Sequence, residues 1–379
     1  MNITTGNSRH LHTVMHLIDT GGPGGAETLF AQLAKRIHGG SLQPLPVVPR
    51  EGWLSGYLRS LGLQPLIVPA RGSVNTAYIA ALVKLVRRNR AKLIHTHLLG
   101  SAVYGAVVGL ITRTPVIAVL HGPTDFKSPG KFAFAKRWLL ARGCSALVAV
   151  SSSTHEALVD FGMRPETITL IQNGVDTDLY SPGSAEGLRL ELGLEPNDLL
   201  VAAVGNIRTP KAYEILIRCA ADVLQRMPRT FFVVIGEGSE SATSSLQQLI
   251  DSLDLGARFK LLGFRKNTAD LYRNFDVFVS SSRTEGLSLS FLEAMASGRA
   301  IVATRSGGAE EAIEPGKSGL LAPIDDPPAL AAALLQVLEN RDLRVNLGSA
   351  ARQRVAEKFS LASTVQKYEA LYQRLLPSK

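Results

Sequence analysis

Two glutamates, Glu285 and Glu293, flank a predicted junction between a strand and a helix. The apolar run at 277–279 predicts a buried strand, and apolar residues at helical spacing from Leu289 predict a helix that ends at Gly298. Ligands of open α/β sheets bind beyond the carboxyl ends of the strands, and the free amides of a helix N-terminus bind phosphate. Carboxylates beside such a terminus accept hydrogen bonds from hydroxyls. The pattern therefore suits a phosphorylated, hydroxyl-rich ligand.

The same residues also fit an ordinary start of a helix. Ser290 and Glu293 have the spacing of a capping box, and a glutamate early in a helix is stabilised by the helix dipole whatever its function. Glu285 is equally compatible with a solvated acid in a loop. From these residues alone, both interpretations stay open.

A glycine and two basic residues follow the strand predicted at 199–204. Gly205 ends that strand, and Arg208 and Lys211 lie just before or at the start of the helix predicted at 211–227. Cationic side chains at this edge of a sheet can neutralise a departing diphosphate without a metal ion. We therefore predict transfer chemistry that needs no divalent cation and no other cofactor.

A glycine-rich loop at 19–25 follows the first predicted strand, at 12–18. Glycine lets a ligand approach the backbone closely. The spacing differs from the GxGxxG of dinucleotide-binding folds, and no acidic residue follows at the distance that ribose recognition needs there. The loop is equally compatible with a tight turn.

Three histidines, His95, His97 and His121, lie at the ends of the strands predicted at 92–97 and 115–120. His95 and His97 lie on one face of their strand, and neighbouring strand ends bring such side chains together. A zinc site would require a fourth ligand or a firm spacing, and the sequence offers neither, so we predict no metal site. For His97 a place in an acceptor cleft and a satisfied position in the core both stay open.

The stretch that begins at Glu285 resembles the signature of the retaining glycosyltransferases of family 4, which use nucleotide sugars and have the two-domain GT-B fold. That signature places two glutamates, separated by seven residues, in an EG…EAMA-G…G-E pattern. The resemblance implies transfer of a sugar from a nucleoside diphosphate to a hydroxyl with retention of the anomeric configuration. The matching residues are Glu285-Gly286, the run 293–298, Gly307-Gly308 and Glu310.

Other loops of the chain match the same family, and the resemblance implies roles for their residues. It implies catalytic roles for His121, Glu285 and Lys211. The family has an arginine where this chain has Asn206, and we infer that Arg208 replaces it. The residues implied to bind the donor are Gly24, Gly25, Gly205, Lys211, Gly236, Arg265, Glu285, Gly286, Leu287, Ser288, Leu289 and Glu293.

The order of predicted elements indicates two domains. The 379 residues exceed one compact core, and strands alternate with helices through both halves, which predicts parallel, doubly wound α/β sheets. Turn residues at 173–183 mark the boundary. With the resemblance, we expect two Rossmann-like domains that face each other across a cleft, residues 1–172 for the acceptor and 173–358 for the nucleotide sugar. The last helix, 359–376, is expected to return to the first domain.

Composition limits the cellular setting. The only cysteines, Cys144 and Cys219, give no disulfide framework, which favours a reducing compartment. No apolar run reaches the ~18–20 residues of a membrane-spanning helix, and the first residues lack the apolar core of a signal peptide. We therefore expect a cytoplasmic protein, which is either free or peripheral at the inner face of the membrane.

Charge is unevenly distributed along the chain. Residues 1–172 contain 18 Lys and Arg against 7 Asp and Glu, a balance of +11, whereas residues 173–379 contain 23 against 25. This asymmetry indicates an anionic partner for the first half. The segment 131–142, KFAFAKRWLLAR, has the composition of helices that lie on anionic membranes, although a half-buried helix with a solvated basic face fits equally well.

These observations lead to a predicted function. We expect a retaining glycosyltransferase with a glycan or lipid-linked glycan acceptor, acting in the synthesis of a cell-surface polysaccharide. A catalytically inactive sugar-nucleotide-binding or scaffold protein of the same fold is the first alternative. A nucleic-acid-binding protein is the second, suggested by an isoelectric point near 9.6, although the chain has no zinc-finger or helix-turn-helix pattern and no interleaved basic and aromatic residues.

Overall fold

The first half of the chain forms one parallel sheet of seven strands. The structure, a computed structural model, describes residues 12–38, 42–70, 75–123, 126 and 132–376. The strands are mostly apolar because a parallel sheet is buried on both faces. They lie in the order β3-β2-β1-β4-β5-β6-β7 and comprise β1 (His12–Ile18), β2 (Leu42–Val48), β3 (Leu66–Ile67), β4 (Leu93–His97), β5 (Val116–Leu120), β6 (Ala146–Ala149) and β7 (Ile168–Leu170).

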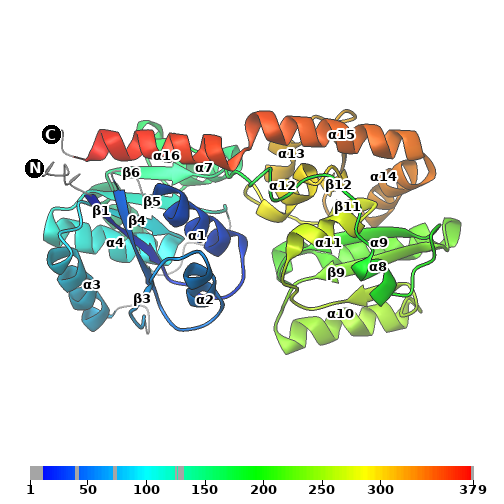
Figure 1. The fold of residues 1–379 in the computed structure, drawn as a ribbon, viewed down its shortest axis with the longest axis horizontal. Helices are drawn as coiled ribbons and strands as arrows, with labels where there is room; N and C mark the ends of the chain where they lie inside the picture. The colour runs from blue at the N-terminus through cyan, green and yellow to red at the C-terminus, as the bar shows by residue number, and fades with distance from the viewer. Residues whose placement is uncertain (1–11, 39–41, 71–74, 124–125, 127–131, 377–379) are drawn as a thin grey trace, which may run out of the picture.

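Helices connect these strands and cover the sheet (Figure 1). Their amphipathic stripes bury leucine, valine and alanine against the strands, as in α1, where Leu29, Phe30 and Leu33 are buried. The helices are α1 (Gly25–Ile37), α2 (Trp53–Ser60), α3 (Thr76–Arg88), α4 (Leu99–Thr112), α6 (Ala133–Gly143) and α7 (Ser152–Asp160).

The second half forms a parallel sheet of six strands in the order β10-β9-β8-β11-β12-β13. Its strands are β8 (Leu199–Val204), β9 (Thr230–Ile235), β10 (Phe259–Leu261), β11 (Val277–Ser280), β12 (Ala300–Thr304) and β13 (Leu320–Ala322). Its helices are α8 (Gly187–Glu191), α9 (Tyr213–Arg226), α10 (Glu240–Ser252), α11 (Thr268–Asn274), α12 (Leu289–Ala296), α13 (Gly308–Ala312), α14 (Pro327–Glu339) and α15 (Arg341–Lys358).

Strand order reverses once in each sheet, between β1 and β4 and between β8 and β11. At such a reversal the flanking connections leave on opposite faces, so a crevice opens beyond the carboxyl ends of the strands. The predicted fold class, two Rossmann-like doubly wound domains, is confirmed. Among the described residues, no helix has both the length and the apolar character that a membrane crossing requires.

The last helix, α16 (Leu361–Leu375), lies over the first sheet, although it follows the whole second domain in the chain (Figure 1). Its Tyr372 hydroxyl lies 2.6 Å from Nδ1 of His95 on β4. The backbone of Val175, in the outward connection between the domains, bonds to Phe359 and Leu361 in the return connection, at 2.9 and 2.8 Å. The two connections therefore run side by side.

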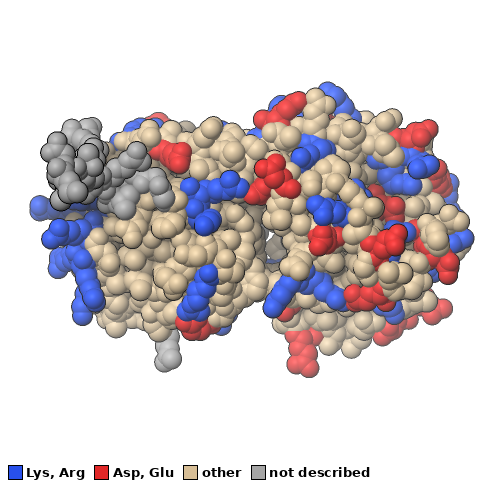
Figure 2. All heavy atoms as spheres, in the orientation of Figure 1, with Lys and Arg blue, Asp and Glu red and all other residues tan. Residues whose placement is uncertain are grey.

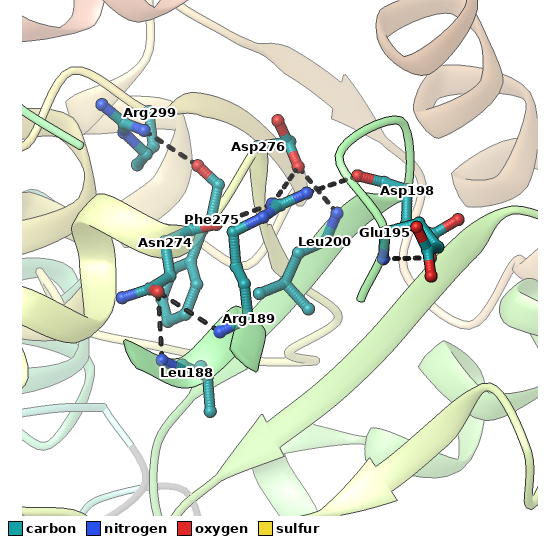
Figure 3. A network of polar contacts seen from close by, with 9 residues as sticks. All are labelled: Leu188, Arg189, Glu195, Asp198, Leu200, Asn274, Phe275, Asp276 and Arg299. Atoms are coloured by element: carbon teal, nitrogen blue, oxygen red, sulfur yellow. Dashed lines mark hydrogen bonds and ion pairs between the residues drawn. The ribbon is translucent and has the colours of Figure 1, made fainter. Parts of the chain in front are cut away.

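A polar network fixes α8 to the amino ends of the second sheet (Figure 3). The guanidinium of Arg189 donates to the carboxylate of Asp276 at 3.0 Å and to the carbonyl oxygen of Asp198 at 2.5 Å. The same carboxylate oxygen of Asp276 accepts from the amide of Leu200 at 2.8 Å. Asn274 accepts from the first amides of α8, Leu188 at 3.2 Å among them. This end of the sheet is thus closed by satisfied polar contacts.

Candidate active site

The loops at the carboxyl ends of the two sheets meet across the domain interface. Asn206, after β8, donates to the carbonyl of Pro23, after β1, at 3.0 Å. Asn173 donates to the carbonyl of Leu287, after β11, at 2.6 Å. A Cβ atom on Gly286 would lie 2.5 Å from the carbonyl oxygen of His121, so glycine is required for this approach. The site is therefore built from both domains.

Lys211 and Glu285, both predicted from the sequence, form an ion pair in this cleft. Lys211 Nζ lies 2.6 Å from Glu285 Oε1, and about four fifths of each side chain is buried, with exposures of 20% and 18%. Ser282 donates to the same carboxylate oxygen at 3.0 Å. A lysine held here by a single carboxylate is placed to exchange that partner for the oxygens of a diphosphate.

The local backbone explains where Lys211 sits. Residues Thr209–Lys211 form a 3-10 turn, and Ala212 has a left-handed φ of 49°, so α9 begins at Tyr213 rather than at Lys211 as predicted. The carbonyl of Lys211 accepts from Ser281 Oγ at 3.0 Å. The turn thereby binds directly to the loop that carries Glu285.

Gly205 and Gly236 are predicted to let the donor approach the backbone. In the structure they let two loops approach each other: a Cβ atom on Gly236 would lie 2.0 Å from the carbonyl oxygen of Gly205. Both glycines have a φ near +155°, at 156° and 155°, which side chains rarely adopt. Their observed role is to pack the loops after β8 and β9 together.

Two helix N-termini face each other across the cleft. Gly24 is the N-cap of α1 and Ser288 is the N-cap of α12, and neither terminus has a side-chain cap among the described residues. A Cβ atom on Gly25 would be in van der Waals contact with Leu289, at 3.8 Å. Helical amides and the helix dipole favour anions. The carboxylate of Glu27 lies against Gly24 at the start of α1, so the N-terminus of α12 is the end that better suits a diphosphate.

The capping-box alternative for Glu293 does not hold. α12 begins at Leu289 with Ser288 as its N-cap, so Ser290 lies inside the helix, where its hydroxyl donates to the carbonyl of Val204 at 2.8 Å. Glu293 is 9% exposed and its Oε2 accepts from the Tyr272 hydroxyl at 2.8 Å. Burial raises the pKa of Glu293, against the lowering effect of tyrosine hydrogen bonds. Its carboxylate is thus buried, whereas the side chain of Glu285 is 18% exposed.

His121 follows β5 and lies beside the loop of Gly286. Its ring stacks on that of His97 with centroids 5.2 Å apart, and its Nε2 is 3.0 Å from His97 Nδ1. Burial lowers the pKa of His121 to about 4, so the ring is neutral near pH 7. His97 is fully buried, which places it in the core rather than on an open acceptor surface.

The two predicted arginines lie away from this ion pair. The side chain of Arg208 is exposed, and only its carbonyl contacts Lys211, accepting from the Lys211 amide at 2.9 Å. The guanidinium of Arg265 pairs with Glu191 at 2.5 and 3.2 Å. The loop of Arg265 still reaches the cleft, because Phe264 contacts Trp53 of α2 edge to face, with centroids 6.4 Å apart.

Sequence reasoning missed Trp53 and assigned no contact between the domains to Asn173 or Asn206. The chain also contains one Asp-x-Asp sequence, Asp176–Asp178, of the kind that can bind a metal. Asp176 is engaged by Arg36 at 2.6 Å and by the amides of residues 178 and 179 at 3.1 and 3.2 Å. It therefore shapes a turn in the connection between the domains.

A pocket of about 680 Å³ opens beside Glu285, between α6 and α7 of the first domain and two loops of the second. Its first-domain wall is aromatic and includes Phe126 and Phe161. Arg137 from the first domain and Arg305 from the second add positive charge to its lining, alongside the acids Glu156 and Asp160. Arg283 also lines it, but its guanidinium is paired with Glu214 and Asp325. The pocket can hold a ligand that is partly apolar and partly anionic.

Comparisons with known proteins agree with this architecture. Residues 23–179 match the family described as Glycosyltransferase Family 4, and residues 186–354 match Glycosyl transferases group 1. A D-inositol 3-phosphate glycosyltransferase of Corynebacterium jeikeium is 28% identical over 306 residues, covering 76% of this chain and 73% of its own. An N-acetyl-alpha-D-glucosaminyl L-malate synthase of Bacillus anthracis is 26% identical, covering 79% of each chain.

Among solved structures, Anabaena Alr3699/HepE in complex with UDP-glucose superposes with a TM-score of 0.86 at 25% identity, covering 95% of this chain and 99% of that one. Both matched families and the Corynebacterium jeikeium relative are described as glycosyltransferases. The Bacillus anthracis relative is, by its name, a synthase that joins a sugar to malate. The two facing sheets and the cleft between them complete the identification: this chain is a glycosyltransferase of the group 1 family with the GT-B fold.

Proposed function

We propose that this enzyme transfers a sugar from a nucleoside diphosphate to a hydroxyl of a glycan or lipid-linked glycan, with retention of configuration. The observation that carries this proposal is the Lys211–Glu285 ion pair, 2.6 Å long, beside the N-terminus of α12. This arrangement has a cation and free amides for a departing diphosphate and a carboxylate for sugar hydroxyls.

Each group has a distinct part in the proposed reaction. Lys211 and the first amides of α12 take up the negative charge that develops on the diphosphate as the glycosidic bond breaks. Glu285 and the neutral ring of His121 orient hydroxyls of the transferred sugar, and Glu293 accepts from the ribose. The UDP-glucose bound to the Anabaena relative supports a UDP-sugar as donor.

We propose that no divalent metal is needed at the diphosphate. Lys211 supplies the positive charge there, and the carboxylate of Asp176 in the Asp-x-Asp sequence is engaged by Arg36. Release of nucleoside diphosphate in excess EDTA should therefore equal release with magnesium. Activity that disappears in EDTA and returns with magnesium or manganese contradicts this part of the proposal.

The acceptor is proposed to lie in the pocket beside Glu285. Its aromatic wall and its arginines Arg137 and Arg305 suit a saccharide with an anionic or lipid-diphosphate group. A hydroxyl held there would face the sugar on the side of Glu285. This placement assigns the acceptor to both domains rather than to the first alone.

The membrane surface is proposed as the place where such an acceptor is met. Phe134 and Trp138, one turn apart on α6, are 71% and 50% exposed, and Ile111 on the adjacent α4 is 49% exposed. Arg137 lies over the Phe134 ring at 5.4 Å. Lys and Arg also gather over α3 at the outer edge of the first domain (Figure 2). Exposed aromatic and basic side chains together favour an anionic bilayer.

A panel of sugar nucleotides tests the proposal. Stabilisation by one nucleotide series, followed by release of nucleoside diphosphate from its sugar derivative, is expected for an enzyme. A scaffold protein of this fold would bind the sugar nucleotide without releasing diphosphate. A nucleic-acid-binding protein would do neither. Proton NMR of the anomeric centre in donor and product distinguishes retention from inversion.

A further inference from the structure

Four histidines form a continuous row across the first sheet. Strand register places His16 of β1 beside His95 of β4, and His97 lies two residues further along β4. Neighbouring ring centroids are 4.8 Å apart from His16 to His95, 4.6 Å from His95 to His97 and 5.2 Å from His97 to His121. The first three are fully buried. The row thus runs from the core of the first domain to the cleft.

Several ring nitrogens in this row lack a partner. Among the described residues, both nitrogens of His16, Nε2 of His95 and Nε2 of His97 are buried and make no hydrogen bond. Leaving such groups unpaired costs free energy, and in folded proteins nearly all of them are satisfied by protein, water or an ion. One ring nitrogen from each of His16, His95 and His97 can be chosen so that the three lie within 4.8 Å of one another.

The other nitrogens of His95 and His97 already have partners. Nδ1 of His95 is 2.6 Å from the Tyr372 hydroxyl, and Nδ1 of His97 is 3.0 Å from Nε2 of His121. Histidines that bind metals typically use one ring nitrogen for the metal and hydrogen-bond the other, which fixes the orientation of the ring. In both rings Nε2 is therefore the nitrogen left for a metal.

We propose that His16, His95 and His97 bind one zinc ion through their ring nitrogens, inside the first domain and behind the donor cleft. Imidazole is a good ligand for zinc, and zinc–nitrogen bonds of about 2.0–2.1 Å in tetrahedral geometry place ligand nitrogens about 3.4 Å apart. The ligand nitrogens now lie within 4.8 Å of one another, so the longest separation would shorten by about 1.4 Å when the ion binds. The site is separate from the diphosphate, so the proposal does not alter the metal-independent transfer chemistry.

A tyrosine beside the row adds to the case for a metal. The hydroxyl of Tyr368 on α16 is also buried without a hydrogen bond among the described residues, and its ring centroid lies 5.3 Å from that of His95. Tyr368 is thus a candidate for the fourth ligand.

The test uses the full chain without a histidine tag, stripped with a chelator and then titrated with zinc alone. Elemental analysis should find one equivalent of zinc bound to the protein after gel filtration. The Tm should rise by roughly 4 °C at a hundredfold excess over the Kd. X-ray absorption should show three nitrogen ligands at about 2.0 Å. Substoichiometric zinc without a shift in Tm, or a shell of oxygens typical of a surface ion, overturns the proposal.

A matched pair of variants locates the site. His16→Leu leaves no described hydrogen bond unmade, because His16 makes none, and it keeps an apolar side chain in the core. His38→Leu removes an exposed histidine of the same domain. Zinc should be lost in His16→Leu and kept in His38→Leu, and retention of zinc in His16→Leu contradicts the assignment. If His16→Leu does not fold, the ligand count from X-ray absorption on the unmodified chain decides.

Discussion

Two acids of the second domain, Asp276 and Glu293, lie towards opposite ends of its sheet and in opposite electrostatic settings. Asp276, just before β11, is bonded by the guanidinium of Arg189 at 3.0 Å and the amide of Leu200 at 2.8 Å (Figure 3). Glu293, on α12 at the cleft, accepts from the neutral hydroxyl of Tyr272 at 2.8 Å. Burial raises the pKa of Glu293 because no comparable cation balances its charge.

The difference separates residues that serve stability from residues that serve ligand binding. A carboxylate whose charge is balanced within the fold contributes to stability, and removing its partner leaves a charge uncompensated. A carboxylate that is buried without such balance destabilises the folded protein. Such a residue is retained where a ligand uses the carboxylate. The same contrast applies to the two ends of the strands in this sheet. The amino ends are closed by polar contacts, and the carboxyl ends present Lys211 and Glu285.

The largest expected effect is on transfer. Lys211→Ala should lower kcat/KM by about 10²–10³-fold, because the departing diphosphate loses the cation that stabilises it. The free energy of unfolding should fall by about 1–2 kcal/mol, because the largely buried Glu285 loses its cation but keeps the hydrogen bond from Ser282. Steady-state release of nucleoside diphosphate measures the first and denaturant titration the second. Lys260→Ala, an exposed lysine of the same domain, is the control and should leave both quantities unchanged.

The opposite result is expected at the other end of the sheet. Arg189→Met should lower the free energy of unfolding by about 2–3 kcal/mol, because Asp276 and the carbonyls of Asp198 and Asn274 lose the guanidinium as a hydrogen-bond donor. Activity per folded molecule should remain unchanged. Urea denaturation compared with Arg341→Met, an exposed arginine on α15, isolates the network. If Arg189→Met lost catalysis without losing stability, the amino and carboxyl ends of the sheet would not be separate in function.

Glu293→Gln is expected to weaken nucleotide binding while it stabilises the folded protein at neutral pH. Glutamine keeps an oxygen that can accept from Tyr272 but cannot carry charge. The Kd for the nucleoside diphosphate should rise about tenfold, because a charge-assisted hydrogen bond to the ribose is replaced by a neutral one. Isothermal calorimetry measures this change, and an unaltered Kd removes Glu293 from the donor site.

The stability of the same variant relative to the unmodified protein should depend on pH. The folded pKa of Glu293 is raised above its ordinary value, so between the two values the folded state keeps a proton that the unfolded state has released. Stability of the unmodified protein therefore falls as pH rises through this window. Above it, Glu293→Gln should be more stable by about 1 kcal/mol, and below the ordinary carboxyl pKa the two proteins should converge. Thermal unfolding between pH 4 and pH 8 gives the comparison.

The smallest expected effect concerns the membrane. Lys136→Glu with Arg137→Glu should weaken co-sedimentation with anionic vesicles several-fold at low salt, because each basic residue contributes roughly 1 kcal/mol near such a surface. Binding of the unmodified protein should also fall as salt rises. The control is Lys260→Glu with Arg341→Glu on the second domain. A protein that stays in the supernatant with both anionic and neutral vesicles contradicts the membrane proposal and leaves sugar transfer untouched.

Much of this architecture can be predicted from local sequence. The strands predicted at 199–204 and 230–235 have the bounds of β8 and β9, because apolar runs between glycines and turn residues define them. Lys211 and Glu285 were both predicted to belong to the site, and they lie 2.6 Å apart. These features depend on residues close in the chain and on the rule that strand ends share an edge.

Other features depend on contacts that no local pattern encodes. His16 was not recognised, because the register between β1 and β4 alone brings it to His95. The contact of Trp53 with Phe264 depends on how the domains face each other. The start of α9 after Lys211 depends on the left-handed backbone of Ala212, which its side chain does not favour. In each case a tertiary contact determines the position.

The return of the chain through α16 gives the molecule a defined pivot. The outward and return connections hydrogen-bond to each other at Val175, so both linkers bend at one place. Rotation about a pivot separates points in proportion to their distance from it. Opening of the cleft should therefore leave the Arg36–Asp176 ion pair almost unchanged, because Asp176 is one residue from the pivot. It should part Trp53 from Phe264 first, because α2 lies at the opposite edge of the interface (Figure 1). The cleft would thus open as a wedge, from the aromatic pair inward.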